Sequence, residues 1–174
     1  MTSYDQSHQR VNTQLNINVG DQSSPDPYVL LNQGIKLLEA KSYQQSINLF
    51  NDAIKANPLI ACVYYYLALA LLGGRRPKIL KRSEIEKIDQ LLATATAMGD
   101  VDATVYWFRA LVRDDYYGGN RMNCPSPSIA SILEFIRPGE TNIDRLRALL
   151  VKLPMTGNEM HMELVNKIYS LERI

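Results

Sequence analysis

The stretch from Leu59 to Leu72 is a nearly uninterrupted run of apolar residues, and it restricts the fold more than any other feature of the chain. The run is 14 residues long, whereas a helix that spans a bilayer needs roughly 20. It is therefore too short for a membrane anchor, although five cations follow it between Arg75 and Arg82. A short helix that is apolar on most sides is usually a core helix. Other elements of the fold must cover it.

Apolar residues at helical spacing occupy both sides of this run. Residues 28–40 carry leucine and isoleucine at intervals of three and four, and residues 43–56 repeat the pattern, which predicts an antiparallel helix pair with a tight turn. Pro58 ends the second helix, because proline lacks an N–H donor and disfavours helical conformation in the residue before it. We therefore predict an all-α fold. Later helices are expected over residues 60–72, 83–97, 103–117, 128–136, 143–153 and 158–171.

The first helix pair carries large, small and aromatic residues at regular places. These places hold Leu30, Gln33, Gly34 and Leu37 on the first helix and Ser46, Phe50, Ala53 and Pro58 on the second. Small residues let two helix backbones approach closely, and an aromatic ring fills the space beside them. The set resembles the tetratricopeptide repeat, a two-helix unit of about 34 residues, and Gln33 is its clearest departure from the family pattern.

The family period predicts the domain organisation. Steps of about 34 residues from Pro27 place the second unit at Ala61 and a degenerate third unit near Ala103. The second helix of the second unit begins later in the sequence than the family period places it, which predicts a basic insertion over residues 73–82. Ser83 is the predicted N-cap of this helix, and Glu86 completes a capping box. The expected parts are a flexible polar arm over 1–26 with a candidate short strand at 13–19, repeats over 27–137, and a C-terminal helical hairpin over 138–174.

The resemblance implies a concave groove lined by four places on the first helix of each unit. These places hold Tyr28, Leu31, Ile35 and Leu38, then Cys62, Tyr65, Leu69 and Leu72, and then Thr104, Trp107, Leu111 and Asp114. Relatives that bind charged peptide ends use Lys, Arg and Asn at such places, so a carboxylate clamp is not expected. About ten apolar side chains, at roughly 1.5–3 kcal/mol each, are too costly to leave in water.

The sequence leaves two alternatives for what covers this groove. One is an amphipathic helix or apolar peptide of a partner protein, anchored on Tyr65 and Trp107. The other is the C-terminal helix of the chain itself folding back as a cap. Its apolar stripe consists of Met160, Leu164, Ile168 and Leu171.

The basic loop is a second candidate site. It contains Arg75, Arg76, Lys78, Lys81 and Arg82. Such a loop is either solvated and paired with nearby acids such as Asp114 and Asp115, or it binds RNA, an anionic membrane or an acidic protein surface. The two aspartates themselves either close a loop or contact a hard cation or basic peptide.

Composition argues against other classes of function. The net charge of +1 gives no global attraction to nucleic acid or lipid. The only two histidines, His8 and His161, lie near no nucleophile motif, and GGRRPK lacks the Lys-Ser/Thr of a phosphate loop. We therefore expect no enzyme, no cofactor and no metal site. Two cysteines and the absence of an apolar leader point to the cytoplasm.

Together these features predict a protein-interaction module: an adaptor, scaffold or assembly factor that binds an amphipathic helix or apolar peptide. The alternative is an accessory protein that binds RNA or an anionic surface through the basic loop. Homo- or hetero-oligomerisation through the N-terminal arm is a third hypothesis, because Leu15, Ile17 and Val19 alternate with polar residues as in a strand.

Overall fold

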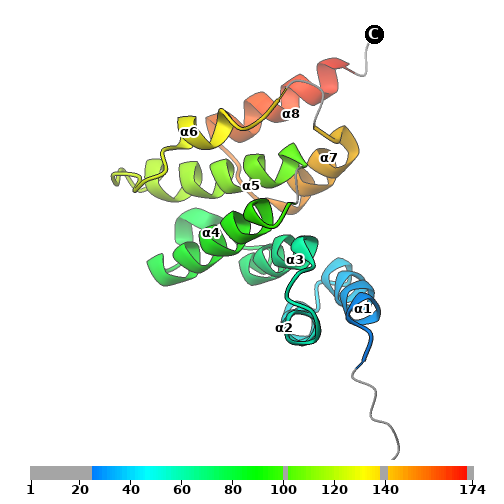
Figure 1. Cartoon of the computed structure of the whole chain (residues 1–174). Helices are drawn as coiled ribbons and strands as arrows, with labels where there is room; N and C mark the ends of the chain where they lie inside the picture. Colours follow the sequence, from blue (N-terminus) through cyan, green and yellow to red (C-terminus); the bar gives the residue numbers. More distant parts are fainter. Residues whose placement is uncertain (1–24, 100–101, 138–140, 172–174) are drawn as a thin grey trace, which may run out of the picture.

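The computed structural model describes residues 25–99, 102–137 and 141–171, and this part of the chain is all-helical (Figure 1). The all-α prediction is thus confirmed, while the candidate strand at 13–19 lies outside the described residues. None of the described helices is long and apolar enough to cross a membrane. The α-helices are α1 (Pro27–Glu39), α2 (Tyr43–Ala56), α3 (Ala61–Leu72), α4 (Arg82–Ala97), α5 (Ala103–Arg113), α6 (Ile129–Leu133), α7 (Ile143–Lys152) and α8 (Glu159–Leu171).

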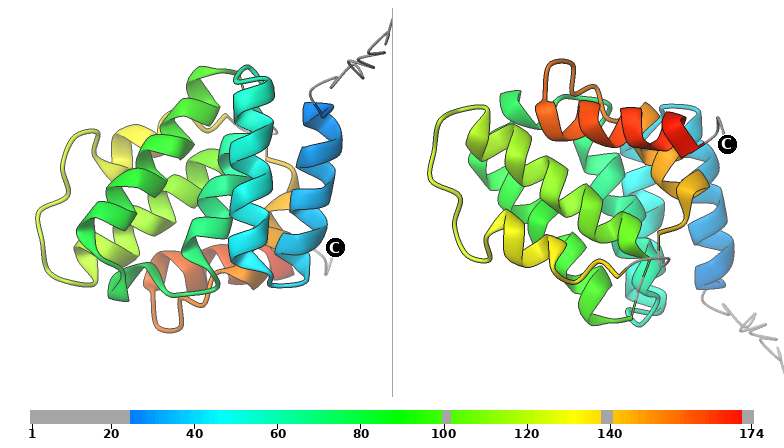
Figure 2. Two further views of the ribbon diagram at one scale, coloured as in Figure 1. Left: turned by 90° about the horizontal axis from the view of Figure 1, so that it is seen from below. Right: turned by 90° about the horizontal axis from the view of Figure 1, so that it is seen from above.

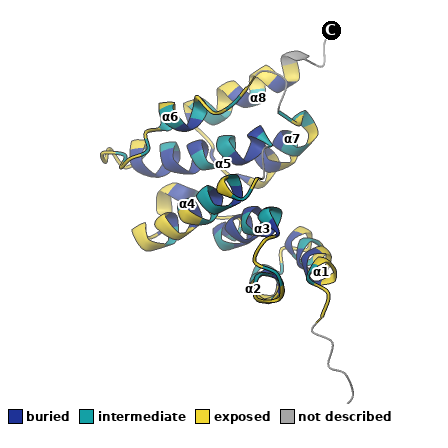
Figure 3. Ribbon diagram, in the orientation of Figure 1, coloured by how far each residue is buried: buried dark blue, intermediate teal, exposed yellow. Residues whose placement is uncertain are grey.

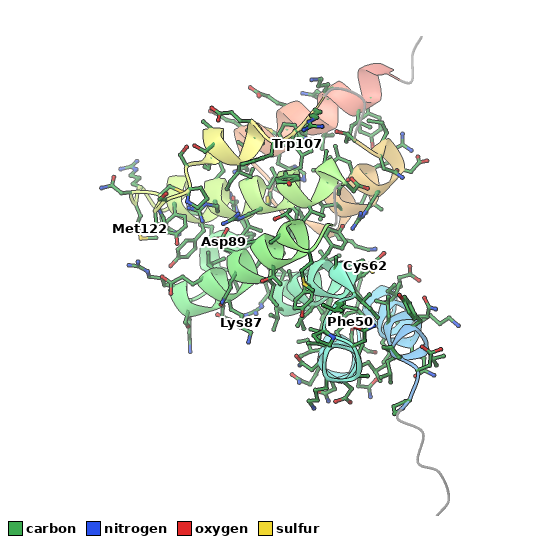
Figure 4. All side chains as sticks on the ribbon, viewed as in Figure 1. Phe50, Cys62, Lys87, Asp89, Trp107 and Met122 are labelled. Carbon is green, nitrogen blue, oxygen red and sulfur yellow. The ribbon has the colours of Figure 1, made fainter. Side chains whose placement is uncertain are left out.

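The first helix pair forms where the sequence predicts it, and its small residues have a packing role. The Asp26 carboxylate caps α1 by accepting the N–H of Tyr28 at 2.8 Å. The Ser46 hydroxyl donates to the backbone carbonyl of Gly34 at 2.8 Å, so the short side chain of Ser46 on α2 contacts the backbone of α1 directly. A Cβ atom at Gly34 would lie 2.5 Å from the ring of Phe50, which is fully buried between the helices (Figure 4).

Each helix from α1 to α5 packs against the next one, and α1 also contacts α3. In Figure 1, α1 and α2 lie at one end of this row and α6 and α8 at the other. The helices α7 and α8 cross one side of the row (Figure 2). Residues from α1 to α5, α7 and α8 share one hydrophobic core, and many exposed residues lie along the outer sides of α1, α2, α4 and α8 (Figure 3).

The basic insertion is folded, and α4 begins earlier than expected. Gly73 ends α3 with a φ of 60°, which favours glycine, and the 3-10 turn η1 (Pro77–Ile79) follows. The Glu84 carboxylate accepts the N–H of Lys81 at 2.9 Å, so Lys81 is the N-cap. The prediction of Ser83 and Glu86 as the capping box is therefore wrong by two residues. Glu86 instead pairs with Arg82 at 2.8 Å.

The third unit departs most from a regular helix pair. The helix α5 ends at Arg113 and continues as a π turn, η2 (Asp114–Gly118), and α6 is shorter than the expected 128–136. Arg109 and Arg113 of α5 both pair with Asp89 of α4, at 2.8 and 2.7 Å. Arg113 also donates to the carbonyls of Pro125 and Pro127, which holds the loop before α6 against α5.

Candidate interaction surface

Most of the predicted groove is closed. Tyr65 is only 3% exposed, and Leu31, Leu38, Leu69, Leu72, Thr104 and Leu111 are also buried. Four more are half-buried: Ile35, Cys62, Trp107 and Asp114. Of the predicted groove residues, only Tyr28 is exposed, at 57%. The predicted groove is therefore not open along all three units, because its central and last parts are filled by the chain itself.

The C-terminal hairpin provides this cover. Arg145 of α7 lies over the ring of Tyr65, 4.5 Å from its centre, and pairs with Asp102 at 3.1 Å. At the start of α8, Asn158 donates to the Asp114 carboxylate at 2.7 Å. Trp107 projects from α5 toward the side on which α8 lies (Figure 4). The internal cover is thus the observed one, and α7 contributes to it as well as α8.

The apolar stripe that the sequence predicts on the last helix lies on the buried side of α8. Leu164 and Ile168 are buried in the shared core, and Met160 packs against it. The side chain of Leu171 lies outside the described residues. The stripe therefore belongs to the core of the protein and is not a free docking face.

The Tyr65 hydroxyl has an unusual environment as a result. Burial raises the pKa of this hydroxyl well above its ordinary value of 10.0, and the charge of Arg145 opposes that rise in part. A neutral tyrosine in contact with a guanidinium suits a structural role. Tyr65 is thus a core residue and is not available as an anchor for a partner.

We predict an alkaline weakening of the fold from this burial. Below pH 10 both the folded and the unfolded chain hold the proton, whereas above it the unfolded chain releases the proton and the folded chain keeps it, so the free energy of unfolding falls as pH rises. Tyr65→Phe should reduce this slope in urea unfolding between pH 8 and about 11. Burial also raises the pKa of Tyr117, so part of the slope should remain. Tyr28→Phe, an exposed control, should keep the wild-type slope; equal slopes for Tyr65→Phe and wild type would contradict the prediction.

The basic loop is fastened to the fold by its own charges. Arg76 pairs with Asp115 through its Nε and Nη2 atoms at 3.0 and 2.7 Å, and Asp115 is completely buried. The same carboxylate accepts the N–H of Lys78 at 3.0 Å, and Arg76 also donates to the carbonyl of Thr156 at 2.8 Å. This cluster joins the insertion, the π turn and the turn before α8. Asp115 therefore closes a loop, as one of the interpretations expected.

Two further cations of the loop are also paired. Arg75 bonds to Glu84 at 2.9 Å, and Arg82 bonds to Glu86 at 2.8 Å. Ion pairs thus engage Arg75, Arg76 and Arg82, three of the five cations. Within the described ranges, no group of three His, Cys, Asp or Glu residues is arranged to hold a metal ion. These contacts fix the loop against α4, the π turn and the turn before α8.

One apolar part of the groove stays open, at the end where α1 lies. A hollow of about 320 Å³ separates the ends of α1 and α3 from the end of α7. We call it the end hollow. It is lined by Leu38, Glu39, Lys41, Tyr43, Leu69, Gly74, Val151, Lys152 and Pro154. Of these, Leu38 and Leu69 were predicted groove residues.

Val151 lines the end hollow and was not among the predicted groove residues. Its side chain is 82% exposed, although it belongs to an apolar run on α7. Helical periodicity marks Leu146, Leu149 and Leu150 as core, and all three are buried. No local signal indicates that Val151, next to them in sequence, faces an opening between distant helices.

Two other hollows are less suited to recognition. The first, about 510 Å³, is polar, and its lining includes Arg76 and Asp115, which already bind each other. The second, about 260 Å³, lies beside the stacked rings of Tyr106 and Phe135, 5.8 Å apart. Arg109, which lines it, is paired with Asp89. The end hollow combines an apolar floor with unpaired apolar surface at its mouth.

Comparisons with protein-family models, with curated proteins and with solved structures find no match to this chain. The geometry of the helix row, the closed groove and the end hollow is therefore what a functional proposal must start from. The end hollow is one part of this geometry that offers uncovered apolar surface.

Proposed function

We propose that this chain is a protein-interaction module of the tetratricopeptide-like kind, acting as an adaptor, scaffold or assembly factor. The consecutive packing of α1 to α5 and the close approach of Gly34, Ser46 and Phe50 support the resemblance that the sequence carries. We further propose a cytoplasmic setting, because neither Cys62 nor Cys124 takes part in a disulfide in the described part of the chain.

The observation that carries this proposal is the exposed side chain of Val151 beside the apolar floor of the end hollow. Leu38 and Leu69 form part of that floor and are nearly buried, so a ligand side chain can contact them only from the mouth. Ligand pockets usually measure about 300–1,000 Å³. With about 320 Å³, the end hollow accommodates one or two side chains of a partner.

Charges at the rim indicate the chemistry of that partner. Lys41 and Lys152 are exposed at the mouth, and Glu39 is the single carboxylate among the lining residues. This excess of positive charge favours a carboxylate next to the apolar anchor. The partner we propose is therefore an apolar peptide or amphipathic helix with an acidic residue beside the side chain that enters the end hollow.

A pair of matched substitutions tests this function. Val151→Glu places a charge in the mouth of the end hollow, and Leu59→Glu makes the same kind of change at a side chain of similar exposure, 77%, in the turn between α2 and α3. Affinity capture with the full chain should lose its partner with Val151→Glu, by about tenfold or more, which corresponds to about 1.4 kcal/mol. It should keep the partner with Leu59→Glu.

The same experiment can reject the proposal. Equal capture by Val151→Glu and wild type would show that recognition does not use the end hollow, and equal loss in both variants would point to nonspecific adhesion. Tyr65 and Arg76 are unsuitable test positions, because Tyr65 is buried under Arg145 and Arg76 holds the buried Asp115, so that their loss would disturb the fold. The alternative of RNA or anionic-surface binding has less support, since three of the five loop cations are engaged within the protein.

A further inference from the structure

The hollow of about 260 Å³ between α4, α5 and α6 differs from the end hollow in its chemistry. We call it the aromatic hollow. Both α4 and α6 pack against α5, so neighbouring helices build this hollow. It is lined by Thr96 and Ala97 of α4, Tyr106 and Arg109 of α5, Pro127 of the loop before α6, Ile132 of α6 and Phe135, which follows α6.

Two stacked aromatic rings line the aromatic hollow. The rings of Tyr106 and Phe135 lie 5.8 Å apart, and their planes differ by 15°. Phe135 is 65% exposed, although Ile132, three residues before it, is buried. Aromatic rings attract each other beyond the apolar area that they bury, so this stack can take a further ring against it.

Two hydrogen-bond donors of α5 also line the aromatic hollow. Tyr106 and Arg109 are three residues apart, so they lie on the same side of the helix. Arg109 binds the Asp89 carboxylate through Nε at 2.8 Å and through Nη2 at 3.1 Å. Its Nη1 and the Tyr106 hydroxyl make no hydrogen bond within the described part of the chain. Both donors are therefore left for a ligand.

The charges beside the aromatic hollow do not cancel. Asp89 also accepts from Nη1 of Arg113, at 2.7 Å, and arginine side chains keep their charge in proteins. Across residues 25–99, 102–137 and 141–171, neither Arg109 nor Arg113 pairs with another acid, so the three side chains carry one net positive charge. Only 14% of the Arg109 side chain and 2% of the Arg113 side chain are exposed, so water screens this charge weakly. An anion at the free Nη1 of Arg109 is thus favoured.

We propose that the aromatic hollow binds a small aromatic carboxylic acid in its ionised form. One oxygen of its carboxylate accepts from the Tyr106 hydroxyl and the other from Nη1 of Arg109, while its ring packs on the stack of Tyr106 and Phe135. A purely apolar ligand would leave both donors unpaired, which is why this hollow suits an apolar peptide less than the end hollow does. The inference does not depend on the proposed function, because the two hollows have no residue in common.

The size of the aromatic hollow favours a free acid over a longer ligand. Pockets for drug-sized ligands usually measure about 300–1,000 Å³, and this hollow of about 260 Å³ is smaller. A single ring with a short link to its carboxylate is therefore the suitable shape, and 3-phenylpropionate is the probe that we choose. So small a ligand makes few contacts, so we expect a dissociation constant in the millimolar range.

Titration of the full chain with 3-phenylpropionate, followed by methyl NMR, tests the inference. We expect saturable shifts of the methyl signals of Ile132 and Ala97, which line the aromatic hollow, and no shift of Val151 at the end hollow. The amide 3-phenylpropanamide has the same ring without the charge. It should bind about tenfold more weakly, because hydrogen bonds to an ionised acceptor are the stronger ones.

Matched substitutions locate the carboxylate. Tyr106→Phe keeps the stacked ring and removes its hydroxyl, so it should weaken binding of 3-phenylpropionate by about tenfold. Tyr169→Phe removes a hydroxyl from an exposed ring of α8 and should leave the affinity unchanged. Arg109→Met should remove the preference for the acid over the amide. Circular dichroism checks the fold of this variant, in which Asp89 keeps Arg113 as its partner.

Four outcomes would overturn the inference. Absence of saturable shifts at Ile132 and Ala97 would show that the aromatic hollow is no binding site for the acid. Equal affinities for the acid and the amide would show that the positive charge is not used. Unchanged binding in Tyr106→Phe would place the carboxylate elsewhere. Tighter binding of the peptide glycyl-glycyl-phenylalanine than of 3-phenylpropionate would identify the end of a peptide chain as the ligand in place of a free acid.

Discussion

Replacing Asp115 by Asn is expected to lower the free energy of unfolding by about 2–4 kcal/mol. Removal of one partner from a buried ion pair usually costs about 3–5 kcal/mol, because the other charge remains unpaired. Arg76 keeps 30% exposure, so water screens part of that charge, and the expected loss is smaller than for a fully buried pair. Asparagine also turns an N–H donor toward a guanidinium that itself only donates.

Urea unfolding followed by circular dichroism measures this loss. Glu86→Gln is the matched control, since it removes one carboxylate from a pair in which Arg82 and Glu86 are 69% and 54% exposed. That control should leave the unfolding midpoint nearly unchanged. Similar midpoints for the two variants would show that the contact between the insertion and the π turn does not stabilise the fold.

Gly34→Ala is expected to have opposite effects in two backgrounds. In the wild type, the new methyl group would lie 2.5 Å from the Phe50 ring, and such overpacking costs about 1–3 kcal/mol. Phe50→Ala alone should cost about 3–5 kcal/mol, because the ring is completely buried. Once the ring is gone, Gly34→Ala should stabilise the protein by up to about 1 kcal/mol, the helix preference of alanine over glycine.

The four proteins of this cycle can be compared by thermal and urea unfolding. Phe135→Ala serves as a control for the loss of an aromatic ring, since Phe135 is largely exposed and should contribute much less than Phe50. A Gly34→Ala effect of the same sign and size with and without Phe50 would mean that the two positions do not touch. The packing reason for the small residue at this place would then be lost.

Sequence reasoning succeeded where the signal is local. The turn after α1, the proline that ends α2 and the short apolar helix α3 follow from residue spacing and from the missing N–H of Pro58. Boundaries were less accurate where side chains compete. The observed start of α4 differs from the predicted one because both Glu84 and Glu86 have the spacing to complete a cap. Arg75, nine residues before Glu84, bonds to the Glu84 carboxylate and helps to hold it at the cap.

The groove illustrates the opposite case. Its residues lie on α1, α3 and α5, except Asp114, which lies in the π turn η2. Whether they are open depends on α7, since Arg145 covers Tyr65 from a position 80 residues later in the chain. From the sequence, a partner protein and the C-terminal helix were alternative covers for the groove. The prediction of an internal cover involved α8 alone and did not include α7.

The sequence by itself determined the helices, because helix formation depends on contacts within one turn: periodic apolar residues, caps and a proline stop. The tertiary structure decided which charges are structural and which apolar side chains are free. Arg76 meets Asp115 across 39 residues and Thr156 across 80. Such long-range contacts depend on how whole helices pack. The exposure of Val151 depends on this packing as well, because a side chain is buried only where another surface covers it.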